Sequence, residues 1–127
     1  MVPVSHKTQI RVRYGETDQM GYAYYGVYAQ YYEVGRVEAL RALGITYKEL
    51  EDQGILLPVY SFNIRYHKPA LYDDLVTIET TIPEKPGLRI RFLFKAFNEA
   101  GQLLNEGEVV LVFVSKISKR PVTPPDH

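Results

Sequence analysis

The sequence has no cysteine, and this absence excludes several kinds of site. A chain of 127 residues without cysteine has no disulfide, no zinc–thiolate centre and no cysteine nucleophile. Long apolar runs are also missing, so no segment is predicted to span a membrane. The N-terminal stretch MVPVSHKTQI contains no apolar core of the length that a signal peptide needs. We therefore expect a cytoplasmic protein.

An excess of charge of either sign is missing as well. Fifteen Lys and Arg residues balance fifteen Asp and Glu residues, so no overall field draws the chain toward nucleic acid or a membrane surface. A hydrophobic content of 46% and a charged content of 24% are ordinary for a globular protein. The length predicts a single domain over residues 1–127, large enough to bury a core without crosslinks.

The common catalytic motifs are absent too. The chain has no GxSxG sequence and no histidine between His6 and His67, which argues against a Ser-His-Asp triad. It has no HExxH, and its three histidines are scattered, so no metal site is predicted. P-loop and GxGxxG sequences are missing as well. Any catalysis must therefore come from carboxylates, tyrosines and backbone dipoles.

Tyrosine, by contrast, is abundant and concentrated, because residues 14–36 hold seven of the eleven tyrosines. Strict alternation over Lys7–Tyr14 predicts a strand with one buried face and one basic face. After an acidic loop, a long helix is predicted over Gly26–Leu43, ended by Gly44. Small and aromatic residues spaced three and four apart form one continuous face of this helix: Tyr28, Tyr31, Tyr32, Gly35, Ala39 and Ala42. Further apolar residues widen the buried arc, so the helix should be mostly enclosed: Val27, Val34, Val37 and Leu40.

The rest of the chain is predicted to be mainly β-structure. A short helix over Thr46–Gln53 should begin with a capping box formed by Thr46 and Glu49. Four strands should follow, joined by short turns: Leu56–His67, Leu75–Ile82, Leu88–Asn98 and Gln102–Ser115. This order predicts an α+β fold in which one long helix packs on one antiparallel sheet. The tail, residues 116–127, is predicted to be loose, and dimerisation is expected to cover the remaining apolar surface.

Asp18 is the best candidate for a catalytic group. It lies in the loop just before the predicted helix start at Tyr25 and Gly26, where unpaired N–H groups can polarise a carbonyl oxygen. The local alternative is structural: Asp18 caps the following helix or solvates the turn, while Tyr25 and Gly26 merely begin that helix. Glu16 and Glu33 are interpreted as solvated charges. The basic strand residues are interpreted as a solvated face that could also hold phosphates: Lys7, Arg11, Arg13, Arg89, Arg91 and Lys95.

One long segment carries a resemblance to a known family. The sequence RVRYGETDQMG at residues 11–21, followed by Tyr24-Tyr25-Gly26, Tyr28, Tyr32-Glu33 and Arg36, resembles the hotdog-fold acyl-CoA thioesterases. The branch that it resembles most is the 4-hydroxybenzoyl-CoA thioesterase and YbgC-like group. The match continues through three further stretches, in the same order along the chain: Leu43–Ile45 with Tyr47, Ile64–Tyr66 with Lys68–Ala70, and Glu106–Glu108. The resemblance implies a hotdog fold, with a five-stranded antiparallel sheet wrapped around one central helix.

The resemblance also implies an activity: hydrolysis of an acyl-CoA thioester to a carboxylic acid and free coenzyme A. Asp18 matches the catalytic aspartate, acting as nucleophile or as general base for water, and Tyr25 with Gly26 matches the oxyanion donors. Coenzyme A is part of the substrate, and neither a cofactor nor a metal is expected. We predict four substrate-binding residues: Val27, Lys68, Arg89 and Arg91. Members form homodimers that join their sheets edge to edge, and some dimers pair into homotetramers.

This chain departs from the family pattern at two positions. Many relatives carry histidine where this chain has Tyr25, and asparagine where it has Val27. Tyrosine keeps the backbone donor but removes a potential side-chain base, which places more weight on Asp18. Valine removes a polar group near the helix start, and this change bears on the rate of turnover or on the acyl group preferred.

Three alternatives remain at this stage. The first is a non-catalytic acyl-CoA or acyl-carrier binder, which Val27 makes plausible. The second is an enoyl-CoA hydratase of the same fold, but such enzymes usually pair a carboxylate with a histidine, and none lies near Asp18 in the sequence. The weakest is nucleic-acid binding through the basic strand face, which the neutral total charge disfavours.

Overall fold

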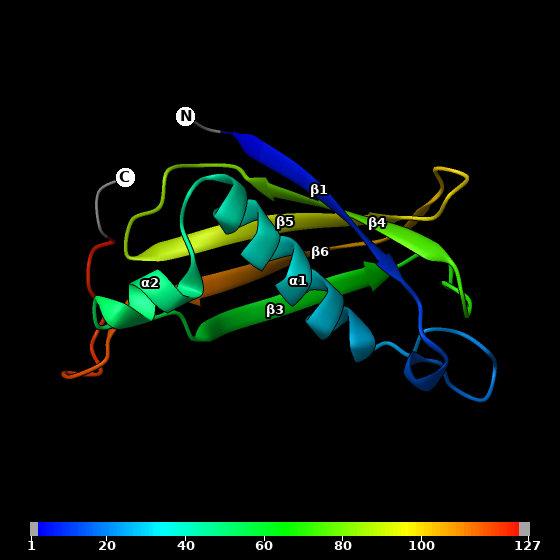
Figure 1. Ribbon diagram of the computed structural model, residues 1–127, viewed down its shortest axis with the longest axis horizontal. Helices are drawn as coiled ribbons and strands as arrows, with labels where there is room; N and C mark the ends of the chain where they lie inside the picture. Colours follow the sequence, from blue (N-terminus) through cyan, green and yellow to red (C-terminus); the bar gives the residue numbers. More distant parts are fainter. Residues whose placement is uncertain (1–2, 125–127) are drawn as a thin grey trace.

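The computed structural model describes residues 3–124 and shows one long helix lying across an antiparallel sheet (Figure 1). The helix is α1 (Val27–Ala42), and the strands of the sheet follow the order β1-β4-β5-β6-β3. The bounds of these strands are β1 Val4–Arg11, β3 Val59–Tyr66, β4 Leu75–Ile82, β5 Arg89–Phe97 and β6 Leu103–Val112. The predicted α+β fold, with a five-stranded antiparallel sheet around one long helix, is confirmed. Within residues 3–124, no helix has the length and apolar character needed to cross a membrane.

Helix α1 buries most of the face that the spacing predicted. Five of the six predicted residues on that face are buried: Tyr28, Tyr31, Tyr32, Gly35 and Ala39. The sixth residue, Ala42, is exposed. Val34, which was predicted to widen the buried arc, is 41% exposed. A Cβ atom at Gly35 would stand only 2.6 Å from Thr80 Oγ1, so the helix backbone approaches β4 closely. The helix ends at Ala42, one residue before the predicted Leu43, and Gly44 follows with a φ of +85° that suits the predicted glycine cap.

The second helix, α2 (Tyr47–Asp52), also forms where it was expected. Thr46 is its N-cap, and its hydroxyl accepts a 3.2 Å hydrogen bond from the Glu49 N–H. The predicted strand Leu56–His67 is wrong as one unit. Its first part is β2 (Ile55–Leu56), which pairs with β7 (Val114–Ser115) in a separate small sheet, and β3 starts only after Pro58. Proline has no N–H for a ladder hydrogen bond, which accounts for the break.

A register shift between Val59 and Ser61 interrupts the predicted alternation at the start of β3. The ring of Tyr60 lies against the Arg89 guanidinium, 4.0 Å from ring centroid to Cζ, and Tyr60 is 60% exposed. In the sequence, Tyr60 alternates in step with Phe62, Ile64 and Tyr66, which would place all four on one face of a regular strand. The bulge breaks this period of two at Tyr60.

The first strand ends earlier than its alternation predicted. β1 stops at Arg11, and Tyr14 is 78% exposed at the start of a short 3-10 helix, η1 (Tyr14–Glu16). The Val12 N–H donates to the Asp74 carbonyl, and the Asp73 N–H donates to the Val12 carbonyl. The chain therefore leaves the β1–β4 ladder at Val12 and enters the loop that leads to α1.

Of the remaining strands, β4 and β5 agree closely with prediction, but the predicted strand Gln102–Ser115 is wrong as one unit, because β6 stops at Val112 and Val114–Ser115 form β7 in the small sheet. The bounds of β4 match, β5 and β6 begin within a residue of the expected start, and the Asn98–Gly101 turn closes with the Asn98 N–H on the Gln102 carbonyl. β6 lies inside the sheet, between β5 and β3. The tail is held further than expected, because the Lys116 N–H donates to the Gly54 carbonyl and the Val122 N–H to the Phe113 carbonyl. Residues 125–127, also predicted to be loose, lie outside the described residues.

Candidate active site

The loop between β1 and α1 closes on itself as a tight turn. Thr17 and Ala23 form an antiparallel bridge, and inside it the Asp18 N–H donates to the Tyr22 carbonyl at 2.8 Å. The Gly21 N–H returns a 2.9 Å hydrogen bond to the Asp18 carbonyl, and Gly21 has a φ of +81°, a conformation that few other residues adopt easily. The turn therefore fixes the backbone position of Asp18.

The Asp18 side chain is exposed and takes part in its own turn. Its Oδ1 accepts hydrogen bonds from the N–H groups of Met20, at 2.9 Å, and Tyr22, at 3.2 Å. Asp18 thus caps its own turn, whereas the structural interpretation expected it to cap the following helix or to solvate the turn. Its other oxygen, Oδ2, makes no hydrogen bond with the described residues, so one carboxylate oxygen faces solvent. A structural role of Asp18 in its turn and a catalytic role are therefore compatible.

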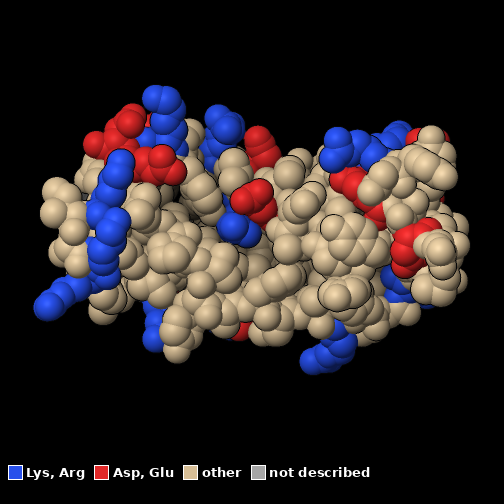
Figure 2. Space-filling model, turned by 90° about the horizontal axis from the view of Figure 1, so that it is seen from below, with Lys and Arg blue, Asp and Glu red and all other residues tan. Residues whose placement is uncertain are grey.

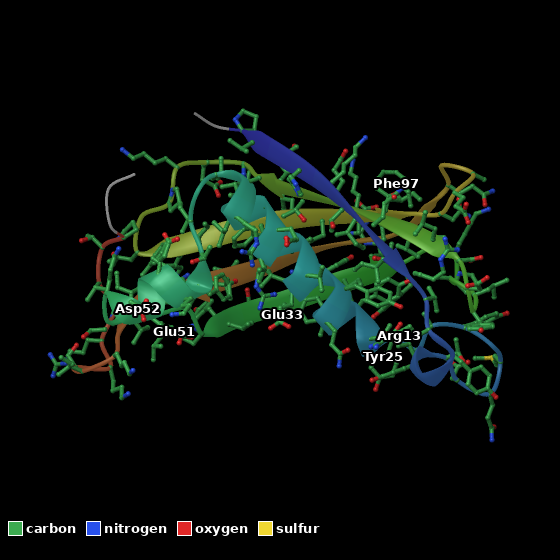
Figure 3. All side chains as sticks on the ribbon, viewed as in Figure 1. Arg13, Tyr25, Glu33, Glu51, Asp52 and Phe97 are labelled. Carbon is green, nitrogen blue, oxygen red and sulfur yellow. The ribbon has the colours of Figure 1, made fainter. Side chains whose placement is uncertain are left out.

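The start of α1 presents backbone donors without acceptors. The N–H groups of Val27, Tyr28 and Ala29 donate to the carbonyls three residues before them at 3.1–3.3 Å. Among residues 3–124, by contrast, neither the Tyr25 N–H nor the Gly26 N–H finds an acceptor. They stand at the positive end of a 16-residue helix, where an anionic oxygen is stabilised. Tyr25 lies at this helix start (Figure 3), and its carbonyl is held by the Tyr66 hydroxyl at 3.0 Å.

The tyrosines further along α1 belong to the core. Burial raises the pKa of Tyr28 to about 12, and burial likewise raises the pKa values of Tyr31 and Tyr32. Their hydroxyls therefore stay protonated at neutral pH and cannot act as general bases. Tyr32 stacks on Phe94 with ring centroids 4.3 Å apart, which is a packing contact.

Glu16 was predicted to be a solvated loop charge, and that prediction is wrong. Glu16 is only 8% exposed, and both of its carboxylate oxygens are engaged. Its Oε1 accepts from the Arg13 N–H at 2.9 Å and the Tyr31 hydroxyl at 2.8 Å, while its Oε2 accepts from the Arg13 guanidinium at 3.0 Å. Burial by itself would raise the pKa of Glu16, but these hydrogen bonds outweigh burial and hold that pKa below its usual value.

The lowered pKa of Glu16 predicts a pH dependence of stability. A group whose pKa is depressed in the folded state contributes stability above its unfolded pKa, here 4.5, and that stability is lost as the pH falls through the folded value. We expect Glu16→Gln to be less stable than the unmodified protein at neutral pH, with the difference shrinking below pH 4.5. Urea unfolding from about pH 7 down to about pH 3 measures this difference. Glu51→Gln, which removes an exposed carboxylate that makes no ion pair within residues 3–124, is the control; a similar curve for both variants would contradict the prediction.

The four predicted substrate-binding residues differ in their surroundings. Val27 is 1% exposed and packs in the core, so its side chain is not presented for contact with a substrate in this chain. Arg91 is paired with Glu84 at 2.7 Å and Glu108 at 3.0 Å; the hydrogen bonds that its guanidinium donates to these carboxylates raise its pKa, and the carboxylates neutralise its charge. Lys68 and Arg89 are exposed, and neither has a carboxylate partner within residues 3–124.

Lys68 and Arg89, the two predicted substrate-binding cations that have no carboxylate partner within residues 3–124, lie far apart in one chain. Lys68 follows the end of β3 at Tyr66, whereas Arg89 lies beside the start of β3 through its contact with Tyr60. Six residues of extended strand separate Tyr60 from Tyr66, or about 20 Å. The other basic strand residues alternate with acidic neighbours, since Lys7 pairs with Glu79 and Lys95 lies opposite Glu79 and Glu106. Within the described part of the chain, no group of three His, Asp or Glu residues is placed to hold a metal ion.

The long helix that lies across the antiparallel sheet, together with the loop that leads to its N-terminus, is the architecture of a hotdog-fold protein. Comparison with known proteins supports this classification. The thioesterase superfamily model matches residues 20–104, and the chain belongs to that family. The chain is 36% identical over 116 residues to the putative acyl-CoA thioesterase YneP of Bacillus subtilis, covering 91% of this chain and 84% of YneP.

Two further comparisons agree. The acyl-CoA thioester hydrolase YbgC of Escherichia coli O157:H7 is 32% identical over 112 residues, covering 88% of this chain and 84% of YbgC. The crystal structure of the DHNA-CoA thioesterase from Staphylococcus aureus superposes with a TM-score of 0.90 and 34% identity, covering 94% of this chain and 80% of that one. The predicted family and hotdog fold are thereby confirmed.

Proposed function

We propose that the protein hydrolyses acyl-CoA thioesters to a carboxylic acid and free coenzyme A. The observation that carries the proposal is the pairing of Thr17 with Ala23, which brings the open oxygen of Asp18 to the same end of the molecule as the unpaired N–H groups of Tyr25 and Gly26. A carboxylate beside an oxyanion site is the arrangement that hydrolysis of a thioester needs. The names of the relatives, as acyl-CoA thioesterases, support the same activity.

In the proposed mechanism, the thioester carbonyl oxygen accepts hydrogen bonds from the Tyr25 and Gly26 N–H groups. As general base, Asp18 takes a proton from a water molecule that attacks the carbonyl carbon, and the tetrahedral intermediate expels the coenzyme A thiolate. As nucleophile, Asp18 attacks that carbon itself, and water then hydrolyses the mixed anhydride. In the first route the acyl carbon gains its oxygen from water; in the second it gains one from Asp18, and water splits the anhydride into the acid and the Asp18 carboxyl group. In both routes the thiolate leaves as a thiol after protonation. The ring of Tyr25 takes no part, since the donor is its backbone.

We also propose a homodimer that pairs the free edge of β3 with its symmetry mate. Large apolar side chains are exposed along this edge: Val59 at 53%, Tyr60 at 60%, Phe62 at 40% and Tyr66 at 45%. Figure 2 views the molecule from the β3 side and shows a broad uncharged surface between scattered charged side chains. A two-fold antiparallel pairing would set the start of one β3 beside the end of the other, and so bring the partner subunit's Arg89 toward Lys68. This pair of cations suits the phosphates of coenzyme A. A dimer of dimers and a cytoplasmic location remain predictions.

Thiol release tests the proposed activity. Purified protein is incubated with coenzyme A thioesters of short, medium and long acyl groups and of aromatic acids, and free thiol is followed with a chromogenic disulfide. We expect release from at least one class, with short-to-medium and aromatic groups favoured by the tyrosine-rich surroundings. Tight binding without release across the panel would instead indicate the non-catalytic binder, which the use of Asp18 Oδ1 in its own turn keeps as a second candidate. Hydration of crotonyl-CoA without thiol release would indicate a hydratase.

The surroundings of the two arginines predict different effects on substrate binding. We expect Arg89→Ala to raise KM for acyl-CoA by about tenfold, because it removes an exposed cation that can pair with phosphate. Arg91→Ala should change KM by less than about threefold, because Glu84 and Glu108 already neutralise that guanidinium. Both variants should act equally well on an acyl-pantetheine, which lacks the nucleotide. A larger effect of Arg91→Ala would contradict the assignment.

A further inference from the structure

We propose that Glu16 is a positioning residue: bound to Tyr31 of α1, it holds the Asp18 turn in place relative to the N–H groups of Tyr25 and Gly26. We call this contact the Glu16–Tyr31 link. The inference rests on the proposed function, since it assigns Glu16 a role in the reaction that Asp18 carries out.

The link connects the helix directly to the loop. Tyr31 is 2% exposed and lies just over one turn after Gly26, and its hydroxyl donates to Glu16 Oε1 at 2.8 Å. Within residues 3–124, it is the one side-chain hydrogen bond between α1 and the segment from Val12 to Gly26. A hydrogen bond between two buried groups has little competition from water, so it restrains the loop strongly.

On the loop side, Glu16 is joined to the turn through its backbone. Its carbonyl accepts from the Tyr24 N–H at 3.1 Å, immediately before Tyr25, and Glu16 is followed by Thr17, which pairs with Ala23. Asp18 is the next residue. A shift of Glu16 would therefore move both ends of the turn, and with them the separation of Asp18 from the helix N-terminus.

Glu16 is not itself placed to react. All the hydrogen bonds of its side chain are to Arg13 and Tyr31, and they use both carboxylate oxygens. The Arg13 guanidinium, whose side chain is 77% exposed, compensates the charge of the buried carboxylate at 3.0 Å. The Glu16 carboxylate thus stays ionised and fixed in place, as a positioning role requires. Asp18, by contrast, keeps one oxygen that makes no hydrogen bond with the described residues.

The test compares two buried helix tyrosines that each lose one hydroxyl. Tyr31→Phe removes the link, whereas Tyr32→Phe removes an equally buried hydrogen bond, to Asn105 Oδ1, that does not involve the loop. We expect Tyr31→Phe to lower kcat by about 10-fold to 100-fold at nearly unchanged KM, as for a small misplacement of a catalytic group. Tyr32→Phe should leave kcat within about twofold, although both variants lose stability.

Amide hydrogen exchange of residues 17–23 gives a readout that does not depend on activity. The loop should exchange faster in Tyr31→Phe than in Tyr32→Phe at matched global stability. If residues 17–23 exchange equally fast in Tyr31→Phe and Tyr32→Phe, or if kcat falls equally in both variants, the positioning role is overturned. If the unmodified protein releases no thiol, the proposed function fails, while the exchange experiment still decides whether the link holds the loop.

Two substitutions of Glu16 separate positioning from charge. Glu16→Gln keeps an oxygen that can accept from Tyr31 and the Arg13 N–H, so kcat should stay within about threefold of the original. Glu16→Ala removes the acceptor, and kcat should fall as far as in Tyr31→Phe. A loss in Glu16→Gln as large as in Glu16→Ala would contradict a positioning role and point to the carboxylate charge instead.

Discussion

Replacing Asp18 with asparagine is expected to lower thiol release by about 10³-fold or more, because a general base or nucleophile is removed while the turn is kept. The asparagine side-chain oxygen can accept the same hydrogen bonds from the Met20 and Tyr22 N–H groups that Asp18 Oδ1 accepts. The turn should therefore persist, and the thermal unfolding midpoint should hardly change. The loss should appear in kcat and, to the same extent, in kcat/KM.

The matched control is Asp52→Asn. Asp52 lies on α2, at the opposite end of the molecule from Tyr25 (Figure 3), and its exposed side chain contacts Lys48 at 3.8 Å. This variant also removes one exposed carboxylate, yet thiol release should be unchanged. Full activity of Asp18→Asn would exclude Asp18 from the chemistry. Unchanged substrate affinity with lost release would show that binding survives without it.

The features of the fold that the sequence predicted well are those set by local patterns. The helix bounds follow from spacings of three and four, and from the positive φ of Gly44 and Gly54 at the two helix ends. The predictions that failed concern features that are set by contacts between residues distant in the sequence. β1 ends at Arg11 because Val12 exchanges hydrogen bonds with Asp73 and Asp74, some sixty residues later. The alternation of β3 gave no sign of the bulge at Tyr60.

In the candidate site too, residues that belong to one short stretch could be picked out from the sequence, whereas contacts between distant residues could not. Asp18, Tyr25 and Gly26 came from a motif in one short stretch, and their backbone geometry suits the roles that the resemblance implies. Glu16 was misjudged because its partner Tyr31 lies fifteen residues away. The ion pairs of Arg91 were not foreseen for a similar reason, since Glu84 and Glu108 reach it from a turn and from β6. A charge in a sequence shows neither its burial nor its partners.

Gly107 is the glycine whose replacement should cost the most stability. It lies on β6 opposite Ile64 of β3 and Phe94 of β5, with the Tyr32 ring over it. A Cβ atom there would stand 2.5 Å from the backbone oxygen of Asn63 and 2.9 Å from Tyr32 Cε2. Neither neighbour can move easily, because the first belongs to the β3–β6 ladder and the second stacks on Phe94.

We expect Gly107→Ala to lower the free energy of unfolding by about 2–3 kcal/mol, the upper part of the usual range for overpacking. Gly35→Ala should cost less, because the nearest atom there is the side-chain oxygen of Thr80, and alanine favours the helix by up to about 1 kcal/mol. Gly87→Ala meets no atom within 4 Å and is the control. Urea unfolding ranks the three variants, and an order in which Gly107→Ala is not the most destabilised would contradict the argument. Because the clash displaces β3, whose free edge forms the proposed dimer interface, Gly107→Ala should also weaken the dimer. Sedimentation at falling protein concentration would detect this weakening.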